Sequence, residues 1–568
     1  MEPVWTRCYD PAVPPSLSYP DLTLPDLLCD AAARYPDRPA LRFYGRVIRY
    51  RELDRLANRF AHALRGLGIR PGSVVGLMLP NLPQSVIGYF GSLRAGVSVT
   101  PINPLYVESE IERQVTDSGC GAILALDLFA PRIEPILGRT CLRHLILTGV
   151  EEYLPSLKRW LYPLKTMGQR PRTSKSASVH RLQRLMTAGD QPPSVRTSPD
   201  DVALLQYTGG TTGVPKGVIL THRNLVGNVW QCRHWMPSLR EGQEVFLAVL
   251  PFFHVYGMSA CQNLAVTVAG SLALLPRFQI SEVLETIARD RVTVFPGIPA
   301  MYSALNSHQH LERYDLRSVK LCISGAGPLP PPVQDRFEAI TGAKLVEGYG
   351  LTEAGPVTHV NPIGLERDRR RLRSIGLPLP DTEAKIVDME TGELELPVGQ
   401  IGELAVRGPQ VMKGYWQRED ETRQVLRGGW LLTGDLARMD EDGFFYIADR
   451  KKDMIKSGGE NVYPREVEEV LLQHPKVRDA VVVGIPQDLR GELIKAFVVL
   501  EDGTEATAAE ILEHCRKDLA KFKVPKRVEF RKELPKTLVG KVLRRVLVEE
   551  ELKRRGRTVD HPDEDAAG

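Results

Sequence analysis

Apolar runs and amphipathic helical stretches alternate in the first part of the chain. From Arg51 to Leu67 the apolar residues recur with the period of an α-helix. An apolar run at 74–79, a second helical stretch at 84–95 and another apolar run at 97–100 follow. This order is typical of βαβ units, in which the strands are parallel. Because the alternation returns between 203 and 345, we expect an α/β fold with parallel sheets.

The composition excludes several classes of protein. The 568 residues are enough for roughly three to four structural units. Lysine plus arginine number 74 and aspartate plus glutamate 70, so the net charge of +4 is too small for a nucleic-acid-binding surface to dominate, and we expect no nucleic-acid partner. The 8 cysteines form no C-x-x-C pair, which argues against a zinc site and a disulfide framework. We expect them to be reduced and mostly buried.

The sequence contains no strong signal for secretion or membrane insertion. Its N-terminus lacks the basic start and the apolar core of a signal peptide. The most apolar stretch, 245–276, exceeds the length of a membrane span, but Pro251, His254 and Gln262 interrupt it. A buried strand, helix and strand explain this stretch better, and we expect a cytoplasmic protein.

The pattern of residues changes after Ser374. Gly-Pro turns separate short strands at 384–388 and 402–407, which predicts a small antiparallel or β-barrel-like unit. From about Asp449 an α+β pattern follows, with a helix at 465–473 opened by Pro464, strands at 477–485 and 494–500, a helix at 508–522 and a basic C-terminal helix. The expected division is a large N-terminal domain at 1–448 and a small mobile C-terminal domain at 449–568, with a hinge at 449–453.

One segment, 153–184, contains many cations. It has eight lysines and arginines and no acidic residue after Glu152. We expect a solvated surface loop, because Pro155 and Pro163 disfavour a helix. Leucines and Trp160 nevertheless recur there at helical spacing, so peripheral contact with the inner face of a membrane is the alternative.

A loop rich in glycine and threonine follows the apolar run at 202–205. Its sequence is YTGGTTGVPKG at 207–217. Glycines let backbone N–H groups approach an anion closely, and Thr208, Thr211, Thr212 and Lys216 add hydroxyl donors and a cation. The loop is therefore predicted to bind phosphate oxygens.

Two better-known nucleotide motifs are absent. The chain has no G-x-x-x-x-G-K-[ST] loop, since Gly540 and Lys541 are followed by Val542. The glycines at 325–330 lack the third glycine of the dinucleotide fingerprint, so a tight turn is the simpler interpretation there.

Six motifs together resemble the adenylate-forming superfamily of acyl-CoA synthetases, coumarate-CoA ligases and luciferases. They are YTGGTTGVPKG at 207–217, PFFH at 251–254, EGYGLTE at 347–353, GWLLTGD at 429–435, DRKKD at 449–453 and PKTLVGK at 535–541. Further motifs at 204–210, 250–258, 410–416 and 461–468 are most similar to those of bacterial long-chain-fatty-acid-CoA ligases. The resemblance covers essentially the whole chain.

This resemblance implies a reaction in two steps. A carboxylate attacks the α-phosphate of ATP to give acyl-AMP and pyrophosphate, and the thiol of CoA then displaces AMP to give a thioester. It implies ATP, Mg²⁺ and CoA as cofactor and cosubstrates, and a fatty acid as the acid. It also implies an N-terminal domain of several subdomains and a mobile C-terminal domain.

The resemblance also implies roles for individual residues. Lys541 would bridge the carboxylate and the α-phosphate, where charge develops in the transition state. Glu353 and Thr208 would bind Mg²⁺, and His254 would lie beside the substrate carboxylate. ATP and AMP would contact these positions: Thr208, Gly209, Gly210, Thr211, Thr212, Gly213, Lys216, Gly325, Ala326, Tyr349, Gly350, Thr352, Asp435, Arg450 and Lys541.

Two further groups belong to the second step. Lys452 matches the hinge residue about which, in the family, the small domain rotates between the two steps. Residues Lys456, Ser457, Gly458 and Gly459 would then approach CoA. Many long-chain ligases have Ser-Gly-Phe-Asn at this loop, whereas Lys456 is similar to the lysine that aids the second step in luciferase-like and aromatic-acid members.

Other functions stay open at this point. An aryl- or medium-chain acyl-CoA ligase would share all six motifs. A non-catalytic paralogue that binds an acyl group or nucleotide is a second alternative, against which Lys541, Glu353, Asp435 and Thr208 argue. An amino-acid-activating module that serves a carrier protein is a third, and no residues after 568 supply a carrier.

Overall fold

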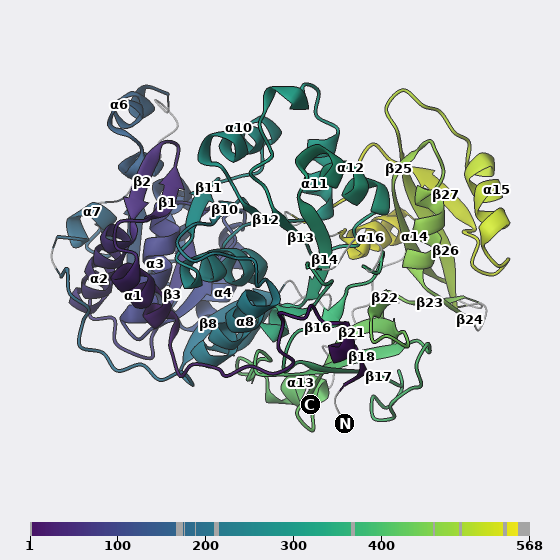
Figure 1. Cartoon of the computed structure of the whole chain (residues 1–568), viewed down its shortest axis with the longest axis horizontal. Helices are drawn as coiled ribbons and strands as arrows, with labels where there is room; N and C mark the ends of the chain where they lie inside the picture. The colour runs from purple at the N-terminus through teal and green to yellow at the C-terminus, as the bar shows by residue number, and fades with distance from the viewer. Residues whose placement is uncertain are drawn as a thin grey trace. The chain divides into compact units, whose positions relative to one another are not determined.

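The computed structural model describes residues 3–165, 174, 176–187, 189–208, 215–364, 370–457, 460–487, 491–537 and 542–554. The chain divides into two units. Unit 1 comprises Met1–Ala384, Val406–Leu431 and Asp442–Phe444, and unit 2 comprises Lys385–Ala405, Leu432–Glu441 and Phe445–Gly568. Figure 1 shows the elements of both units, coloured from purple at the N-terminus to yellow at the C-terminus.

The first sheet of unit 1 is mostly parallel. Its strand order is β19 (Gly414–Tyr415), β9 (Lys216–Thr221), β8 (Val202–Thr208), β4 (Ser98–Pro101), β3 (Val74–Met78), β5 (Cys120–Leu126), β6 (His144–Thr148) and β7 (Val179–Arg181). The strands from β8 to β7 pair in parallel, whereas β8 with β9 and β9 with β19 are antiparallel. The predicted βαβ unit is confirmed, because β3 and β4 are parallel neighbours joined by a helix.

The second sheet of unit 1 has nine strands. Their order is β16 (Leu377–Pro378), β15 (Val357–Val360), β14 (Lys344–Gly350), β13 (Leu321–Ser324), β12 (Val294–Gly297), β10 (Val245–Ala248), β11 (Ser271–Leu274), β1 (Pro39–Phe43) and β2 (Arg46–Arg49). The five pairings from β14 to β1 are parallel, and the pairings at both ends of the sheet are antiparallel.

Helices of unit 1 cover these sheets. They are α1 (Leu24–Arg34), α2 (Tyr50–Gly66), α3 (Pro83–Arg94), α4 (Glu108–Ser118), α5 (Ala130–Ile133), α6 (Ser156–Lys165), α7 (Leu182–Leu185), α8 (His222–Trp235), α9 (Leu264–Thr267), α10 (Ile280–Asp290), α11 (Pro299–Asn306), α12 (Pro331–Thr341) and α13 (Glu419–Val425). Shorter turns are η1 (Val4–Cys8), η2 (Asp127–Phe129), η3 (Glu134–Ile136), η4 (Val150–Tyr153), η6 (Leu311–Arg313) and η7 (Thr352–Ala354), and η5 (Tyr256–Asn263) is a π-helix.

A large apolar core lies between the second sheet and three helices. Figure 1 shows α10, α11 and α12 along β10 to β14. Buried Phe295 of β12 contacts the rings of Tyr302 in α11 and Phe337 in α12. The apolar stretch at 245–276 contributes β10, η5, α9 and β11 to unit 1, so the predicted buried strand, helix and strand are confirmed. No helix among the described residues is long and apolar enough to cross a membrane.

Unit 2 contains most of a five-stranded sheet. Its strands are β17 (Glu383–Val387), β18 (Gly402–Arg407), β21 (Trp430–Met439), β20 (Leu426–Arg427) and β22 (Phe445–Arg450), and β21 pairs antiparallel with β22. The strands predicted at 384–388 and 402–407 are thus confirmed as parts of a sheet.

The rest of unit 2 is a second sheet with helices on it. Strands β24 (Glu460–Val462), β23 (Ile455–Ser457), β26 (Gly491–Leu500) and β25 (Val477–Gln487) lie in that order, and β27 (Arg527–Phe530) pairs with β26. Successive residues of β25 pack on opposite faces of the sheet. Val482 lies in one core cluster with Leu471 of α14 (Pro464–Leu472), and Val483 lies in another with Leu547 of α16 (Arg544–Arg554).

Two predictions of local structure are wrong. Residues 156–165 form α6, although we expected a loop; Pro155 directly precedes the helix, a position where proline is tolerated. Helix α15 (Ala508–Asp518) ends before the predicted Phe522, because Leu519 is extended and its N–H donates to Cys515 O. The other predicted helices and strands agree with the structure to within about three residues at each end, since β26 begins at Gly491 rather than at 494 and β8 continues to Thr208 rather than ending at 205.

Candidate active site

The predicted phosphate loop begins and ends on paired strands of unit 1. Thr208 is the last residue of β8 and lies opposite Lys216, the first residue of β9, in an antiparallel register. Both side chains are half-buried. The two ends of the loop are therefore fixed by strand pairing, whereas Gly209, Gly210, Thr211, Thr212 and Gly213 lie outside the described residues.

Tyr415 joins two of the predicted site residues. Its hydroxyl donates a hydrogen bond of 2.9 Å to Glu353 Oε1, and the ammonium of Lys216 lies 5.3 Å from the centre of its ring. Lys216 also forms an ion pair with Glu421. Burial, reinforced by the Glu353 carboxylate, raises the pKa of Tyr415 above its usual range, so the phenol remains a donor. Lys216 and Glu353 thus flank one ring.

The backbone fixes this arrangement. Strand β19 pairs antiparallel with β9, which places Tyr415 opposite Val218. The N–H of Met412 donates to Glu353 O at 2.7 Å. Residues 410–416 therefore hold the short helix η7, which contains Thr352 and Glu353, close to the start of β9.

Glu353 and Thr208 fit a magnesium ion by their chemistry. Both are half-buried and offer hard oxygen ligands. Tyr415 orients one carboxylate oxygen of Glu353. Two protein oxygens suit an ion that keeps several waters and binds phosphate oxygens as well.

His254 is positioned from the same strand that ends at Thr208. Buried Gln206 of β8 donates from Nε2 to the backbone oxygen of Phe253 at 3.1 Å. Asn81 Nδ2 donates to Ala248 O and Leu250 O, which shapes the turn before His254. Gln206 and Asn81 were missed by sequence reasoning, since a single amide side chain gives no pattern.

A narrow cavity of about 20 Å³ lies beside η5. Phe252, Phe253, Met258 and Gln262 line it, together with residues in or next to β3, α3 and β4, which are Leu77, Leu79, Ser85, Tyr89 and Pro101. Its walls are mainly apolar, and its volume suits about one water molecule.

The predicted adenine-side residues follow the carboxyl ends of neighbouring parallel strands. Gly325 and Ala326 follow β13, and Tyr349 and Gly350 end β14, with Ser324 opposite Glu347. Ligands of open α/β sheets bind at such ends. A Cβ on Gly350 would lie 2.2 Å from Pro356 O, so no side chain fits there. The Tyr349 ring is half-buried and meets His359 edge-on at 6.0 Å.

The predicted ribose-binding pair belongs to unit 2. Asp435 of β21 lies opposite Arg450 of β22, and Arg450 Nε is 3.3 Å from Asp435 Oδ1. The Asp435 carboxylate is buried, and Arg450 is partly exposed. Next to them, Lys451 Nζ donates to Glu403 at 2.7 Å, and the N–H of Gly434 donates to the same carboxylate. The turn at Gly434 is therefore tied to the start of the predicted hinge.

The remaining predicted residues of unit 2, apart from Lys541, lie close to the predicted hinge in sequence. Burial, followed by the charge of Arg450, lowers the pKa of Lys452 to about 8. Lys456 is exposed, and its N–H donates to Glu492 at 2.8 Å. Ser457 ends β23 opposite Glu460. Gly458, Gly459 and Lys541 lie outside the described residues.

Fold and site together define an α/β nucleotide-binding enzyme with a separate C-terminal unit. Residues 28–416 match the profile of the AMP-binding enzyme family, and residues 466–541 match that of the AMP-binding enzyme C-terminal domain. The chain belongs to the AMP-binding enzyme family.

Individual relatives extend over nearly the whole chain. A long-chain-fatty-acid–CoA ligase of Bacillus subtilis is 47% identical over 96% of this chain and 98% of its own length. One of Yersinia pestis is 41% identical over 97% of this chain and 99% of its own. The crystal structure of an anthranilate CoA ligase with anthranoyl-AMP is 29% identical, with a TM-score of 0.82 over 95% of this chain and 98% of that chain.

Proposed function

We propose that this protein is an ATP-dependent acyl-CoA ligase that activates long-chain fatty acids. The observation that supports it most is the linked set of Thr208, Lys216, Tyr415 and Glu353. This set combines an anion-binding loop base, a cation and a metal-binding carboxylate. The similarity to long-chain-fatty-acid–CoA ligases over nearly the whole chain supports the long acyl chain.

The proposed reaction has two steps. In the first, the fatty-acid carboxylate attacks the α-phosphorus of ATP and pyrophosphate leaves. Lys216 and Lys541 would offset the negative charge that gathers on the phosphates, and His254 would orient the carboxylate. In the second, the thiol sulfur of CoA attacks the acyl carbon and AMP leaves. Mg²⁺, held by Glu353 and Thr208, would screen the charge of the triphosphate.

The same proposal assigns nucleotide contacts and a hinge. Asp435 and Arg450 would hold the ribose, since a buried carboxylate accepts from both hydroxyls. Residues 449–453, with Lys452, would be the hinge between domains at 1–448 and 449–568. Lys456 and Ser457 would approach CoA in the second step.

Release of pyrophosphate tests the function. The protein is incubated with ATP and Mg²⁺ and with palmitate, octanoate or benzoate, each with and without CoA. We expect palmitate to react fastest and the thioester to form only with CoA. A faster reaction with octanoate or benzoate would replace the substrate class but not the mechanism, and no release with any acid would favour a non-catalytic paralogue.

A matched pair of variants separates chemistry from folding. Lys541→Ala should lower the rate of acyl-AMP formation by about 100-fold or more, because a charge at the reacting atoms is lost. Lys553→Ala removes an exposed lysine of α16 and should leave the rate unchanged. Equal rates for both variants would contradict the role of Lys541.

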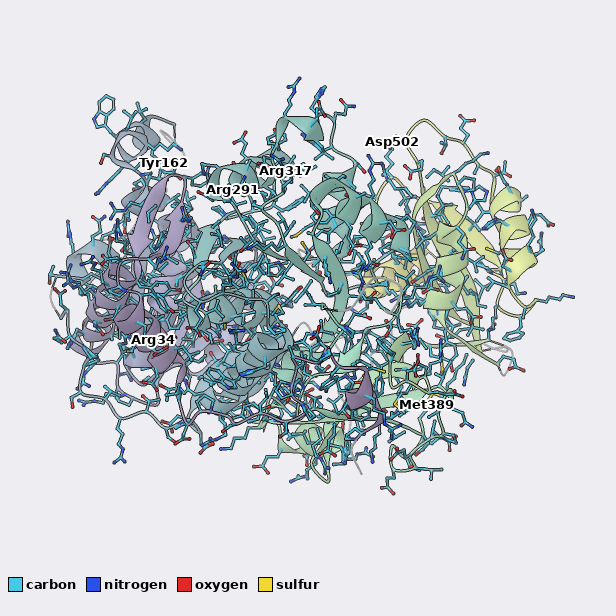
Figure 2. All side chains as sticks on the ribbon, in the orientation of Figure 1. Arg34, Tyr162, Arg291, Arg317, Met389 and Asp502 are labelled. Carbon is cyan, nitrogen blue, oxygen red and sulfur yellow. The ribbon has the colours of Figure 1, made fainter. Side chains whose placement is uncertain are left out.

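We also propose that α6 contacts an anionic membrane surface. Leu157 and Trp160 are 70% and 73% exposed, and Leu161 lies on the same side of the helix as Leu157, four residues further along. Lys158 and Arg159 are exposed between them. Figure 2 shows α6, where Tyr162 is labelled, at the tip of the β1–β2 hairpin, and Lys158 Nζ donates to Tyr44 O in the turn of that hairpin. Apolar residues beside cations suit the interface of an anionic bilayer.

Flotation with vesicles tests this contact. We expect binding to vesicles that contain phosphatidylglycerol and weaker binding to neutral vesicles. The variant Leu157→Ser with Trp160→Ser should lose binding. The control Leu105→Ser with Leu394→Ser removes equally exposed leucines elsewhere and should bind as the unchanged protein does. Equal flotation of the two double variants would contradict the proposal.

A further inference from the structure

One guanidinium group in unit 2 is surrounded by carboxylates next to the predicted hinge. Arg544, the first residue of α16, places Nη2 2.7 and 2.8 Å from the two oxygens of Glu468. Its Nη1 lies 3.3 Å from Asp453 Oδ2. The side chains of Arg544 and Glu468 are only 23% and 13% exposed. The arginine therefore connects α16, α14 and the hinge segment.

Glu468 and Arg544 also bond the backbone N–H and C=O of one residue in an edge strand. Strand β25 lies at the edge of its sheet, so its outward N–H and C=O groups need other partners. The N–H of Val482 donates to Glu468 Oε1 at 2.8 Å, and Arg544 Nε donates to Val482 O at 3.3 Å. Arg544 is thereby fixed at three sides, and its planar group suits such a site better than a lysine would.

Asp449 adds a second link to the hinge. It is buried, and its two oxygens accept from the N–H groups of Arg450 and Arg465, each at 2.7 Å. Arg465 is the second residue of the helix α14 that also bears Glu468. Both ends of the segment 449–453 are therefore bonded to elements that contact Arg544.

In the chain, Arg544 directly follows two residues, 542 and 543, that pair with residues 535 and 536. The N–H of Leu543 donates to Pro535 O at 2.8 Å, and Val542 pairs with Lys536 in an antiparallel bridge. Val542 also packs against the core cluster of Val483 and Leu547. The residues on either side of 537–541, a stretch that includes Lys541, are thus bonded to each other, and Arg544 is the next residue in the chain.

We propose that Arg544 is a positioning residue that holds the paired residues 535–536 and 542–543, which flank Lys541 in the chain, at a fixed place relative to the predicted hinge segment 449–453. This inference rests on the proposed function for its kinetic consequence. The first step requires Lys541 at the α-phosphate, whereas the second does not. Loss of Arg544 should therefore impair formation of acyl-AMP and spare thioester formation.

Separate assays of the two steps test this role. The first is ATP–pyrophosphate exchange with palmitate, and the second is thioester formation from supplied palmitoyl-AMP and CoA. Arg544→Gln should lower kcat of the exchange at least tenfold, with KM for ATP within twofold, and should leave the second step within threefold. Arg544→Lys should restore part of the loss, and Arg545→Gln, which removes a 55% exposed neighbour, should change neither step.

Hydrogen exchange gives a readout independent of activity. The amide of Leu543 should exchange at least tenfold faster in Arg544→Gln and as in the unchanged protein in Arg545→Gln. If Arg544→Gln does not fold, the double variant Arg544→Gln with Glu468→Gln, which leaves no unpaired carboxylate at Glu468, should show the same selective loss.

The outcomes are distinct. Equal slowing of both steps, no slowing of either, or an unchanged exchange rate at Leu543 would overturn the positioning role. Absence of pyrophosphate exchange in the unchanged protein with every acid would instead refute the proposed function, and hydrogen exchange at Leu543 would still decide whether Arg544 holds the paired residues 535–536 and 542–543.

Discussion

Tyr415 illustrates how one hydroxyl can orient a carboxylate that we propose to bind Mg²⁺. It bonds to Glu353 and packs on Lys216, although the three residues are far apart in the chain. Partners that orient a metal ligand commonly change metal affinity by tenfold or more when they are removed. Tyr415→Phe should therefore raise the Mg²⁺ concentration for half-maximal pyrophosphate release by about tenfold, without changing KM for palmitate.

A second tyrosine offers a matched control. Tyr446 in unit 2 donates to Asp440 at 3.0 Å, and this bond involves no predicted site residue. Tyr446→Phe removes the same kind of bond and should leave the Mg²⁺ titration unchanged. If Tyr415→Phe and the unchanged protein need the same Mg²⁺ concentration for half-maximal pyrophosphate release, the bond from Tyr415 does not affect metal binding by Glu353.

His222 should make unit 1 sensitive to mild acid. Burial lowers the pKa of its imidazole to about 4, partly opposed by Asp201 and Asp26, and its Nδ1 accepts from the N–H of Leu24. Below its ordinary pKa of 6.5 the unfolded chain binds a proton that the folded chain does not, so this contribution to stability is lost as the pH falls from 6.5 towards 4.

The expected loss is about 2 kcal/mol between pH 7 and pH 5. His222→Gln has no such titration, so its free energy of unfolding should vary less over this range, although it is less stable at pH 7. His310→Asn changes an exposed histidine and should keep the original dependence. Urea unfolding at both pH values measures this, and parallel curves for His222→Gln and the unchanged protein would contradict it.

At the scale of elements, the contact between α2 and α3 depends on a glycine. A Cβ at Gly91 of α3 would lie 2.8 Å from Ala57 O and 2.9 Å from Phe60 Cβ, both in α2. The two helices approach this closely because the position has no side chain. Gly91→Ala should lower the free energy of unfolding by about 1–3 kcal/mol, since overpacking forces the helices apart.

Gly66, the last residue of α2, provides the opposite case. Nothing lies within 4 Å of the place where its Cβ would be. Gly66→Ala should raise the free energy of unfolding by about 0.5–1 kcal/mol, because alanine restricts the unfolded chain more than glycine does. Denaturant titration of both variants measures the difference, and a Gly91→Ala variant as stable as Gly66→Ala would refute the close packing.

Elements with a regular period were predictable, and those decided by distant contacts were not. The period of residues 51–67 and the proline at 464 predicted α2 and α14 within two residues. Helix α6 forms although Pro155 and Pro163 led us to expect a loop there. Its position is fixed from outside, because Lys158 Nζ donates to Tyr44 O in the β1–β2 turn. Sequence spacing alone does not contain that contact.

For the whole molecule, the eight cysteines report on both units. Five are buried, one is intermediate, and Cys29 and Cys141 are exposed, which confirms that most are buried. In native buffer, alkylation should therefore modify Cys29 and Cys141 first, because the reagent reaches exposed thiols, whereas thiols such as that of Cys261 are buried.

Two buried cysteines separate the units during unfolding. Cys322 lies in the large core of unit 1, and Cys515 lies in the smaller core of unit 2. Because a smaller core stabilises its unit less, Cys515 should become reactive at a lower urea concentration than Cys322. Mass spectrometry of alkylated peptides measures both. Simultaneous labelling would mean that the units unfold as one.

The sequence by itself determined the α/β class, most helices and strands, and the order of the six motifs, because periodicity, turn residues and motifs are local properties. The tertiary structure alone decided that β9, η7 and β19 meet, so that Tyr415 joins Lys216 to Glu353, and that Arg544 connects α16, α14 and the hinge segment. Such contacts depend on how distant elements pack, and no spacing along the chain specifies them.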